Sequence, residues 1–313
     1  MTIYRDALPQ LEERIFLTDG GMETTLIFHD GFELPHFAAF DLLKEAEGAA
    51  AIRRYYETYA RLAVDAGCGF ILESPTWRAS SDWGDKLGYD RQQIADVNLR
   101  SVALLEDIRD ELARPECPVV ISGCVGPRGD GYGADAELSA EEAASYHRPQ
   151  IATFAKSGVD MVGAMTLTSA EEAIGITLGA RELGLPVAIS FTTETDGRLP
   201  NGQPLGDAIQ QVDTETDEGP AYFMINCAHP SHFESALRED GTWRERIRGV
   251  RANASKRSHA ELDDSPDLDS GNPEELGEEY RELRRLLPNL TILGGCCGTD
   301  HRHIDQISRH CVA

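Results

Sequence analysis

The sequence predicts a single α/β domain, a (β/α)8 TIM barrel in which eight parallel strands alternate with helices around one closed sheet. Eight short apolar runs recur along the 313 residues, and amphipathic helical patterns separate them. No second hydrophobic core is apparent in the pattern, and one barrel of this kind fills a chain of this length. We therefore expect one domain over residues 1–313.

Each predicted strand is rich in β-branched or aromatic residues and ends in glycine or a polar residue. Between the strands, apolar residues recur at three- and four-residue spacing, as in the helix expected over 40–67. Residues at about 256–272 are rich in Ser, Asp, Gly and Pro, and this composition predicts a polar surface loop or insertion. The predicted strands are 14–18, 69–73, 119–123, 159–164, 186–191, 221–225, 247–252 and 290–293.

Composition excludes several classes of function. The formal net charge of −25 argues against nucleic-acid binding, because phosphates are bound by basic patches. No apolar run is long enough to span a membrane, and residues 1–10 do not resemble a signal peptide. We expect a cytoplasmic protein with no nucleic-acid or membrane partner. The oligomeric state is not readable from the sequence, and a homo-oligomer is compatible with it.

The run 290–293 leads into Gly294-Gly295-Cys296-Cys297-Gly298-Thr299, which places two adjacent cysteines just beyond a strand end. Adjacent Cα atoms lie about 3.8 Å apart, which is short of the separation of about 4.4 Å or more in a relaxed disulfide. Seven cysteines in a chain without a secretion signal also favour reduced thiols. The pair is therefore interpreted as two soft metal ligands.

A third cysteine, Cys227, follows the sixth predicted strand. In a parallel barrel the carboxyl ends of all strands share one rim, so Cys227 can meet Cys296 and Cys297 there. Three thiolates without a fourth cysteine at a comparable strand end describe an open tetrahedral zinc site. The predicted cofactor is Zn²⁺, held by these three residues.

Four other residues near this rim were weighed as ligands. Cys124 follows the third predicted strand and is the remaining cysteine placed where it can line the site. His229, His301 and His303 lie past strand ends, on a loop or at a helix start. We expect these histidines to face solvent or to contact a ligand residue, and not to bind the metal.

An open zinc site with three thiolates suits the activation of a thiol. The metal holds an incoming thiol as a thiolate near neutral pH and leaves its sulfur nucleophilic. The expected reaction is attack of that thiolate on an electrophilic carbon. The predicted partners are thus small molecules, a thiol acceptor and a donor of the carbon.

Three motifs carry a resemblance to a known family. Asp19-Gly20-Gly21, Asn226-Cys227 and the segment 294–299 resemble the homocysteine S-methyltransferase family, and the likeness extends over nearly the whole chain. The resemblance implies a zinc-dependent barrel that transfers a methyl group to homocysteine and so forms methionine. It also implies that Cys227, Cys296 and Cys297 are the zinc ligands.

The same resemblance implies roles in substrate binding. Asp19, with the backbone at Gly20 and Gly21, would meet the amino acid end of the acceptor. The resemblance further implies that Ser74 or Thr76 lies near that end. Asn226 would help to shape the pocket.

The sequence departs from the family at one position. Many members carry a glutamate after the fourth strand that contacts the acceptor's amino group, whereas this chain has Met165. Methionine cannot accept a charged hydrogen bond, and losing one costs about 1.5–3 kcal/mol. Either Glu73 or Glu194 compensates from a neighbouring strand end, or the acceptor is a different thiol.

The methyl donor is expected to be small, because no folate- or cobalamin-binding domain fits beside the barrel in 313 residues. S-methylmethionine, S-adenosylmethionine and betaine are the candidates. A sulfonium or quaternary ammonium group is attracted by aromatic faces, and Trp77, Trp83 and Tyr132 are expected on rim loops. Ordinary loop packing explains these aromatic residues equally well.

Two alternatives from other classes remain open at this stage. One is a non-catalytic barrel that senses zinc or redox state and lost turnover when Met165 replaced the acceptor contact. The other is a structural zinc site, which requires a fourth protein ligand such as His229 or Cys124.

Overall fold

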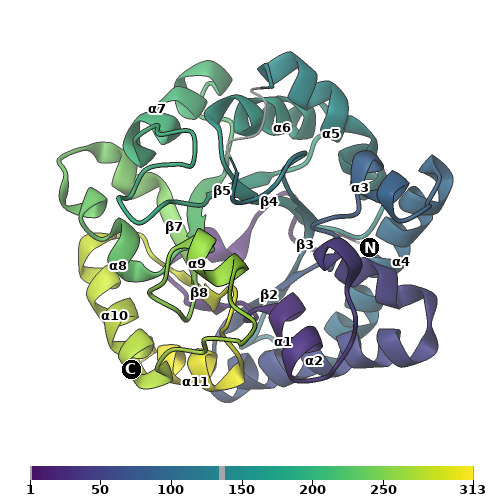
Figure 1. Cartoon of the computed structure of the whole chain (residues 1–313), viewed down its shortest axis with the longest axis horizontal. Helices are drawn as coiled ribbons and strands as arrows, with labels where there is room; N and C mark the ends of the chain where they lie inside the picture. Colours follow the sequence, from purple (N-terminus) through teal and green to yellow (C-terminus); the bar gives the residue numbers. More distant parts are fainter. Residues whose placement is uncertain (1, 134–137, 313) are drawn as a thin grey trace.

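Eight parallel strands, each hydrogen-bonded to the next in chain order, close into a barrel because β8 also pairs with β1 (Figure 1). The computed structural model describes residues 2–133 and 138–312. This arrangement confirms the predicted (β/α)8 fold. The strands are β1 Phe16–Leu17, β2 Gly69–Glu73, β3 Val119–Val125, β4 Met161–Leu167, β5 Val187–Phe191, β6 Tyr222–Asn226, β7 Ile247–Ala252 and β8 Ile292–Gly295.

Most of the helices form the outer ring in Figure 1 and cover the outward-facing side chains of the strands. Several begin with a capping box, in which an N-cap Ser or Asp and a residue three positions later satisfy each other's backbone amides. Within the described part of the chain, none of them combines the length and apolar character that crossing a bilayer requires. They are α1 Met22–Phe28, α2 Ala46–Asp65, α3 Ser81–Lys86, α4 Arg91–Leu112, α5 Ala140–Ala155, α6 Ala170–Glu182, α7 Leu205–Thr216, α8 Pro230–Phe233, α9 His259–Asp263, α10 Pro273–Leu286 and α11 His301–Cys311, with 3₁₀ turns at Pro9–Leu11, Pro35–Phe37, Ala39–Lys44, Ala236–Arg238 and Thr242–Arg246.

Side chains that point inward fill the barrel below its upper rim. They form a separate apolar cluster that includes Phe16, Val120, Met161 and Tyr222, all of which are buried. Gly69 pairs with Phe16, and a Cβ at Gly69 would lie 2.3 Å from the Phe16 ring, so only glycine fits beside it. A pocket opens above this filled interior, at the carboxyl ends of the strands, where functional groups of such barrels gather.

The N-terminal segment closes the opposite end of the barrel. The backbone amides of Ile3 and Tyr4 donate to Asp160 Oδ1 at 2.8 and 2.9 Å, and Arg109 donates to Asp160 Oδ2 at 3.0 Å. Gln10 is fully buried, and its Nε2 lies 3.1 Å from the sulfur of Met161 inside the barrel. A molecule that binds in the barrel therefore enters from the carboxyl end of the sheet.

The segment predicted as a polar loop or insertion at about 256–272 contains the short helix α9. Ser258 and Glu261 form a capping box there, which is the local signal for this helix. Figure 1 shows α9 lying across the open end of the barrel, and its last residue, Asp263, lines the pocket described below. This segment thus covers part of the mouth.

Candidate metal centre

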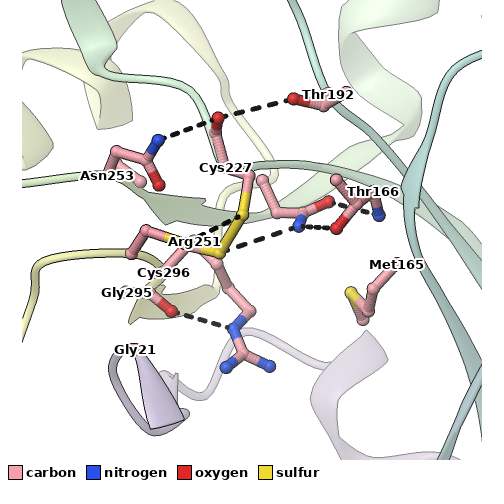
Figure 2. Close-up of a disulfide and its surroundings, with 12 residues drawn as sticks. Gly21, Met165, Thr166, Thr192, Cys227, Arg251, Asn253, Gly295 and Cys296 are labelled. Atoms are coloured by element: carbon pink, nitrogen blue, oxygen red, sulfur yellow. Dashed lines mark hydrogen bonds between the residues drawn. A yellow bond between two sulfur atoms is a disulfide. The ribbon is translucent and has the colours of Figure 1, made fainter. Parts of the chain in front are cut away.

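The three cysteines predicted to bind zinc lie together at the carboxyl ends of β6 and β8. Their sulfur atoms are all within 4.8 Å of one another, and the sulfurs of Cys227 and Cys297 are 4.0 Å apart. The structure also joins Cys227 to Cys296 by a disulfide (Figure 2), so these two cysteines are not the free thiols that the sequence predicted. The reason is geometric, because the ends of β6 and β8 bring these two residues to a Cα–Cα distance of 5.3 Å. Cys297 keeps a free thiol.

The backbone carbonyl of Cys227 is held from three directions. It accepts hydrogen bonds from Asn253 Nδ2 at 3.0 Å, from His259 Nε2 at 2.6 Å and from Thr192 Oγ1 at 3.4 Å. Figure 2 shows the bonds from Asn253 and Thr192. Cys227 has a φ of +54°, a left-handed conformation that is uncommon for residues other than glycine. The surrounding bonds therefore fix a turn that aims the Cys227 sulfur at the β8 loop.

Asn226, expected to shape the pocket, joins β6 to β4 and β5. Its Oδ1 accepts from the Thr166 amide at 2.9 Å and from Ser190 Oγ at 2.6 Å, while its Nδ2 donates to Thr166 Oγ1 at 2.8 Å. Thr166 is left-handed as well, with a φ of +63°. Asn226 lines the pocket and holds this strained turn beside the cysteines.

Two carboxylates and one guanidinium form the inner wall of the site. Arg251, in β7, donates from Nη2 to Asp19 at 2.7 Å and from Nη1 to Glu73 at 2.5 Å, and its Nε bonds the Gly295 carbonyl at 3.1 Å. Tyr55 also donates to Asp19, at 3.0 Å. Burial raises the pKa of Glu73 to about 7, and Arg251 opposes that shift. Because Arg251 pairs with both carboxylates, neither is a free anion.

The sequence analysis did not identify Arg251. Its signal was available, because Arg251 is one of two arginines, with Arg248, inside the predicted strand 247–252. A buried strand tolerates a charged side chain only where a partner of opposite charge meets it. The structure supplies two such partners, and the Arg251 side chain is only 11% exposed.

Gly20 and Gly21 are placed where the sequence predicted a close approach. A Cβ on Gly21 would lie 2.5 Å from the backbone oxygen of Cys296, and one on Gly20 would lie 2.9 Å from that of Thr299. The β1 loop can therefore pack directly on the β8 loop only because both residues are glycine. Asp19, Gly20 and Gly21 all line the same pocket as the three cysteines.

Ser74 and Thr76, both expected near the acceptor, take different positions. Their hydroxyl oxygens are 2.6 Å apart, Ser74 Oγ accepts from the Cys124 amide at 2.9 Å, and Thr76 Oγ1 donates to the Cys124 carbonyl at 2.8 Å. Ser74 and Cys124 line the pocket, whereas Thr76 is fully buried behind it. The Thr76 hydroxyl thus holds the β2 and β3 ends together. The sulfur of Cys124 lies outside the three-sulfur group.

The pocket has a volume of about 310 Å³ and extends from the cysteines to an aromatic mouth. Trp77 and Trp83 lie at that mouth, but the guanidinium of Arg78 is 3.9 Å from one ring centroid and 3.7 Å from the other. The expectation that these rings are available to a cationic donor therefore needs correction, since Arg78 already occupies the space between them. Tyr132 reaches deeper, and its hydroxyl is 3.4 Å from the Cys297 sulfur.

The histidines weighed as ligands lie outside the three-sulfur group. His229 is 2% exposed and contacts Ser231 and Glu279, and His303 caps α11 through the Asp300 amide. His301 is exposed. That none of the three binds the metal stays a prediction.

Of the two carboxylates expected to compensate for Met165, neither is free in the pocket. Glu73 is paired with Arg251. Glu194 is 38% exposed, lies 3.5 Å from His259 and is not among the residues that line the pocket. Met165 does line it, and so does Glu23, a carboxylate in the first turn of α1 that was not identified from the sequence.

Comparison with known proteins places the chain in a family. The model of the homocysteine S-methyltransferase family matches residues 16–311. Homocysteine S-methyltransferase YbgG from Bacillus subtilis (strain 168) is 26% identical over 231 residues, which cover 66% of this chain and 68% of YbgG. Methionine synthase from Mycobacterium leprae (strain TN) is 26% identical over 329 residues, which cover 97% of this chain but 25% of that protein. The chain thus spans about a quarter of the methionine synthase.

Two solved structures of the homocysteine methyltransferase MmuM from Escherichia coli share the fold. The oxidized form has a TM-score of 0.76 and 21% sequence identity, with 94% of this chain and 95% of that chain covered. The metallated form has a TM-score of 0.74 and 20% identity, with 95% and 96% covered. With the family model matching almost the entire barrel, this chain belongs to the homocysteine S-methyltransferase family.

Proposed function

We propose that this protein is a zinc-dependent methyltransferase that moves a methyl group from a small cationic donor to the thiol of homocysteine, giving methionine. The observation that carries this proposal is the group formed by Cys227, Cys296 and Cys297 at the inner end of the pocket. Family membership supports methyl transfer to homocysteine. The proposals that the metal is zinc and that the donor is a cation are inferred from the chemistry of the site.

The three sulfurs fit a zinc ion. Zn–S bonds of about 2.3 Å in a tetrahedral site separate the sulfurs by about 3.8 Å. The sulfurs of Cys227 and Cys297 are 4.0 Å apart, and Cys296 comes within reach once its disulfide is reduced. Three thiolates leave one position for the acceptor, and when bound the metal lowers the pKa of the acceptor thiol so that it ionises near neutral pH. MmuM, which shares the fold, has been solved in a form described as metallated.

The chain's own residues position the reactants and limit the access of water. Gly20 and Gly21 expose backbone close to the sulfurs, and the group of Asp19, Arg251 and Glu73 gives this wall a fixed shape. In the reaction, the acceptor sulfur forms a bond to the methyl carbon while the bond from that carbon to the donor's sulfonium or ammonium atom breaks. The bonding electrons stay with the donor's sulfur or nitrogen atom, which becomes neutral. The negative charge of the acceptor thiolate and the positive charge of the donor cancel as the bond forms. A pocket that limits the hydration of these charges therefore favours the reaction.

The donor is proposed to be S-methylmethionine, S-adenosylmethionine or betaine. Each carries a positive charge, and five carboxylates but only two guanidinium groups line the pocket among the described residues. That excess of negative charge attracts a cation and repels an anionic donor.

The test is a screen of the reduced, zinc-loaded protein against homocysteine, selenohomocysteine and other small thiols with each of the three donors. We expect methionine, identified by its mass, from homocysteine and at least one donor. Heat-treated protein and protein stripped of metal are the controls. If a different thiol is methylated in preference to homocysteine, that thiol is the acceptor and homocysteine is not. If no pair of thiol and donor gives a product, the proposal of an enzyme is rejected.

A prediction about redox state follows from the disulfide. Zinc binds thiolates, so the oxidised protein offers one ligand of the three, whereas the reduced protein offers all three. We expect protein treated with a phosphine reductant to take up about one zinc ion per chain and untreated, fully oxidised protein to take up little. Metal analysis after gel filtration measures both. Equal uptake by both forms would show that the metal does not use the Cys227–Cys296 pair.

The same disulfide favours one alternative, a barrel that senses zinc or redox state without turnover. That protein would bind zinc reversibly on reduction but give no methylated product with any acceptor and donor. The screen and the uptake measurement together separate it from the enzyme.

A further inference from the structure

The charges that line the pocket are unevenly paired. Arg251 forms ion pairs with Asp19 and Glu73, and Arg78 lies 3.7 Å from Asp130. Two lining carboxylates then remain, Glu23 and Asp263. In the described part of the chain, no lysine, arginine or histidine forms an ion pair with either of them.

Glu23 is the more enclosed of these two groups. It is half-buried, whereas Asp263 is exposed at the end of α9. An exposed carboxylate is well hydrated and its ion pairs are weak, so Glu23 is the stronger candidate for a buried cation. Burial raises the pKa of Glu23 to about 7, with Arg251 and Arg78 opposing the shift only from a distance. The protein therefore supplies little of the positive charge that an ionised Glu23 needs.

Glu23 also lies close to where an acceptor would sit. It is two residues beyond Gly21, where an added Cβ would lie 2.5 Å from the backbone oxygen of Cys296. Glu23, Cys297 and Tyr132 all line the same pocket. In homocysteine the nitrogen and the sulfur are separated by about 5 Å, as expected for a chain of four single bonds. An acceptor whose sulfur sits at the cysteines would thus have its ammonium group about 5 Å away, within the pocket that Glu23 also lines.

We propose that Glu23 binds the α-ammonium group of the acceptor and so selects an amino acid thiol over a simple thiol. This inference rests on the proposed function, since it names the group that determines acceptor specificity at the same site. It also accounts for Met165, because a carboxylate from the first turn of α1 makes one at position 165 unnecessary. Glu73, already neutralised by Arg251, is not required for this contact.

The test compares two thiols that differ only in the amino group, homocysteine and 4-mercaptobutanoate. Their dissociation constants for the reduced, zinc-loaded protein are measured by titration calorimetry, for the wild type and for Glu23→Gln. Glutamine keeps the shape of the side chain and removes its charge. We expect Glu23→Gln to weaken homocysteine binding by about 10- to 100-fold, the effect of losing a charge-assisted hydrogen bond. Binding of 4-mercaptobutanoate should change less than about twofold.

Asp263→Asn is the matched control, because it removes one negative charge from the same pocket. It should alter the binding of both thiols by similar small factors. Circular dichroism and zinc content verify that each variant is folded and loaded, and Glu23→Asp, which keeps the charge, should retain part of the preference for homocysteine. Equal losses for the two thiols in Glu23→Gln, or no loss for either, would overturn the assignment.

This experiment separates the inference from the proposed function. If the wild type methylates homocysteine but Glu23→Gln does not discriminate between the thiols, the role of Glu23 is rejected and the function stands. If homocysteine binding depends on Glu23 but no donor yields a methylated product, the acceptor site stands and the methyltransferase proposal is rejected.

Discussion

Replacing Cys227 or Cys297 by alanine is expected to abolish both zinc binding and methyl transfer while leaving the barrel folded. Each variant leaves only two thiolates, too few for the proposed site with three protein ligands. Changes to residues that merely orient a ligand weaken metal binding by about 10- to 100-fold, so removal of a ligand should exceed about 100-fold. Metal analysis and a competition assay with a chromophoric chelator measure the loss.

Cys124→Ala is the matched control for these variants. Cys124 is buried and lines the same pocket, but its sulfur lies outside the three-sulfur group. This variant should keep about one zinc ion per chain. Full zinc retention in Cys227→Ala and Cys297→Ala would remove the basis for a metal centre at this rim.

Replacing Arg251 by methionine is expected to destabilise the protein by about 3–5 kcal/mol at pH 8. The change strands Asp19 and Glu73, whose side chains are 4% and 7% exposed, without their shared cation. Urea unfolding followed by circular dichroism gives the free energy of unfolding for both proteins. Arg246→Met is the control, since its ion pair with Asp213 on the barrel exterior is more exposed and should cost about 1 kcal/mol or less.

The loss in Arg251→Met should also depend on pH. The folded-state pKa of Glu73 is about 7 with Arg251 present, above the ordinary value of 4.5, and it rises further when the arginine is removed. A group whose pKa is raised on folding binds more protons in the folded state, so stability falls as pH rises through that window. The deficit should therefore be smaller at pH 5 than at pH 8. A deficit that does not change between these values would show that neither carboxylate is stranded.

Most strands could be predicted from the sequence because each is a short apolar run that ends in glycine or a polar residue. The differences have local causes. The first strand was expected over 14–18, but only Phe16 and Leu17 pair with both neighbours. The fourth was expected to end at Ala164, but it continues to Leu167 through an irregularity where Thr166 is left-handed. That conformation depends on Asn226, sixty residues away, and a local pattern cannot reveal it.

The cysteines of the candidate site could be predicted from the sequence because their residue type indicates metal binding. The roles of the carboxylates could not, because they depend on which of them form ion pairs in the folded protein. Three cysteines at strand ends implied convergence, and the structure brings them together. Which carboxylates remain free of ion pairs depends on where Arg251 points, so Glu73 and Glu194 were named as possible acceptor contacts and Glu23 was not. The disulfide was unpredictable as well, because proximity after folding selected Cys296 and left Cys297 free.

The three hydrogen bonds to the Cys227 carbonyl have a consequence for the order of assembly. Asn253, His259 and Thr192 belong to three different segments of the chain, and together they fix the turn that presents the sulfur. In small zinc-finger modules the ion itself organises the polypeptide, and chelation unfolds them. In this barrel, hydrogen bonds from side chains to the Cys227 carbonyl already fix the turn that presents the sulfur. The ion would therefore be able to leave and rebind while the barrel stays folded.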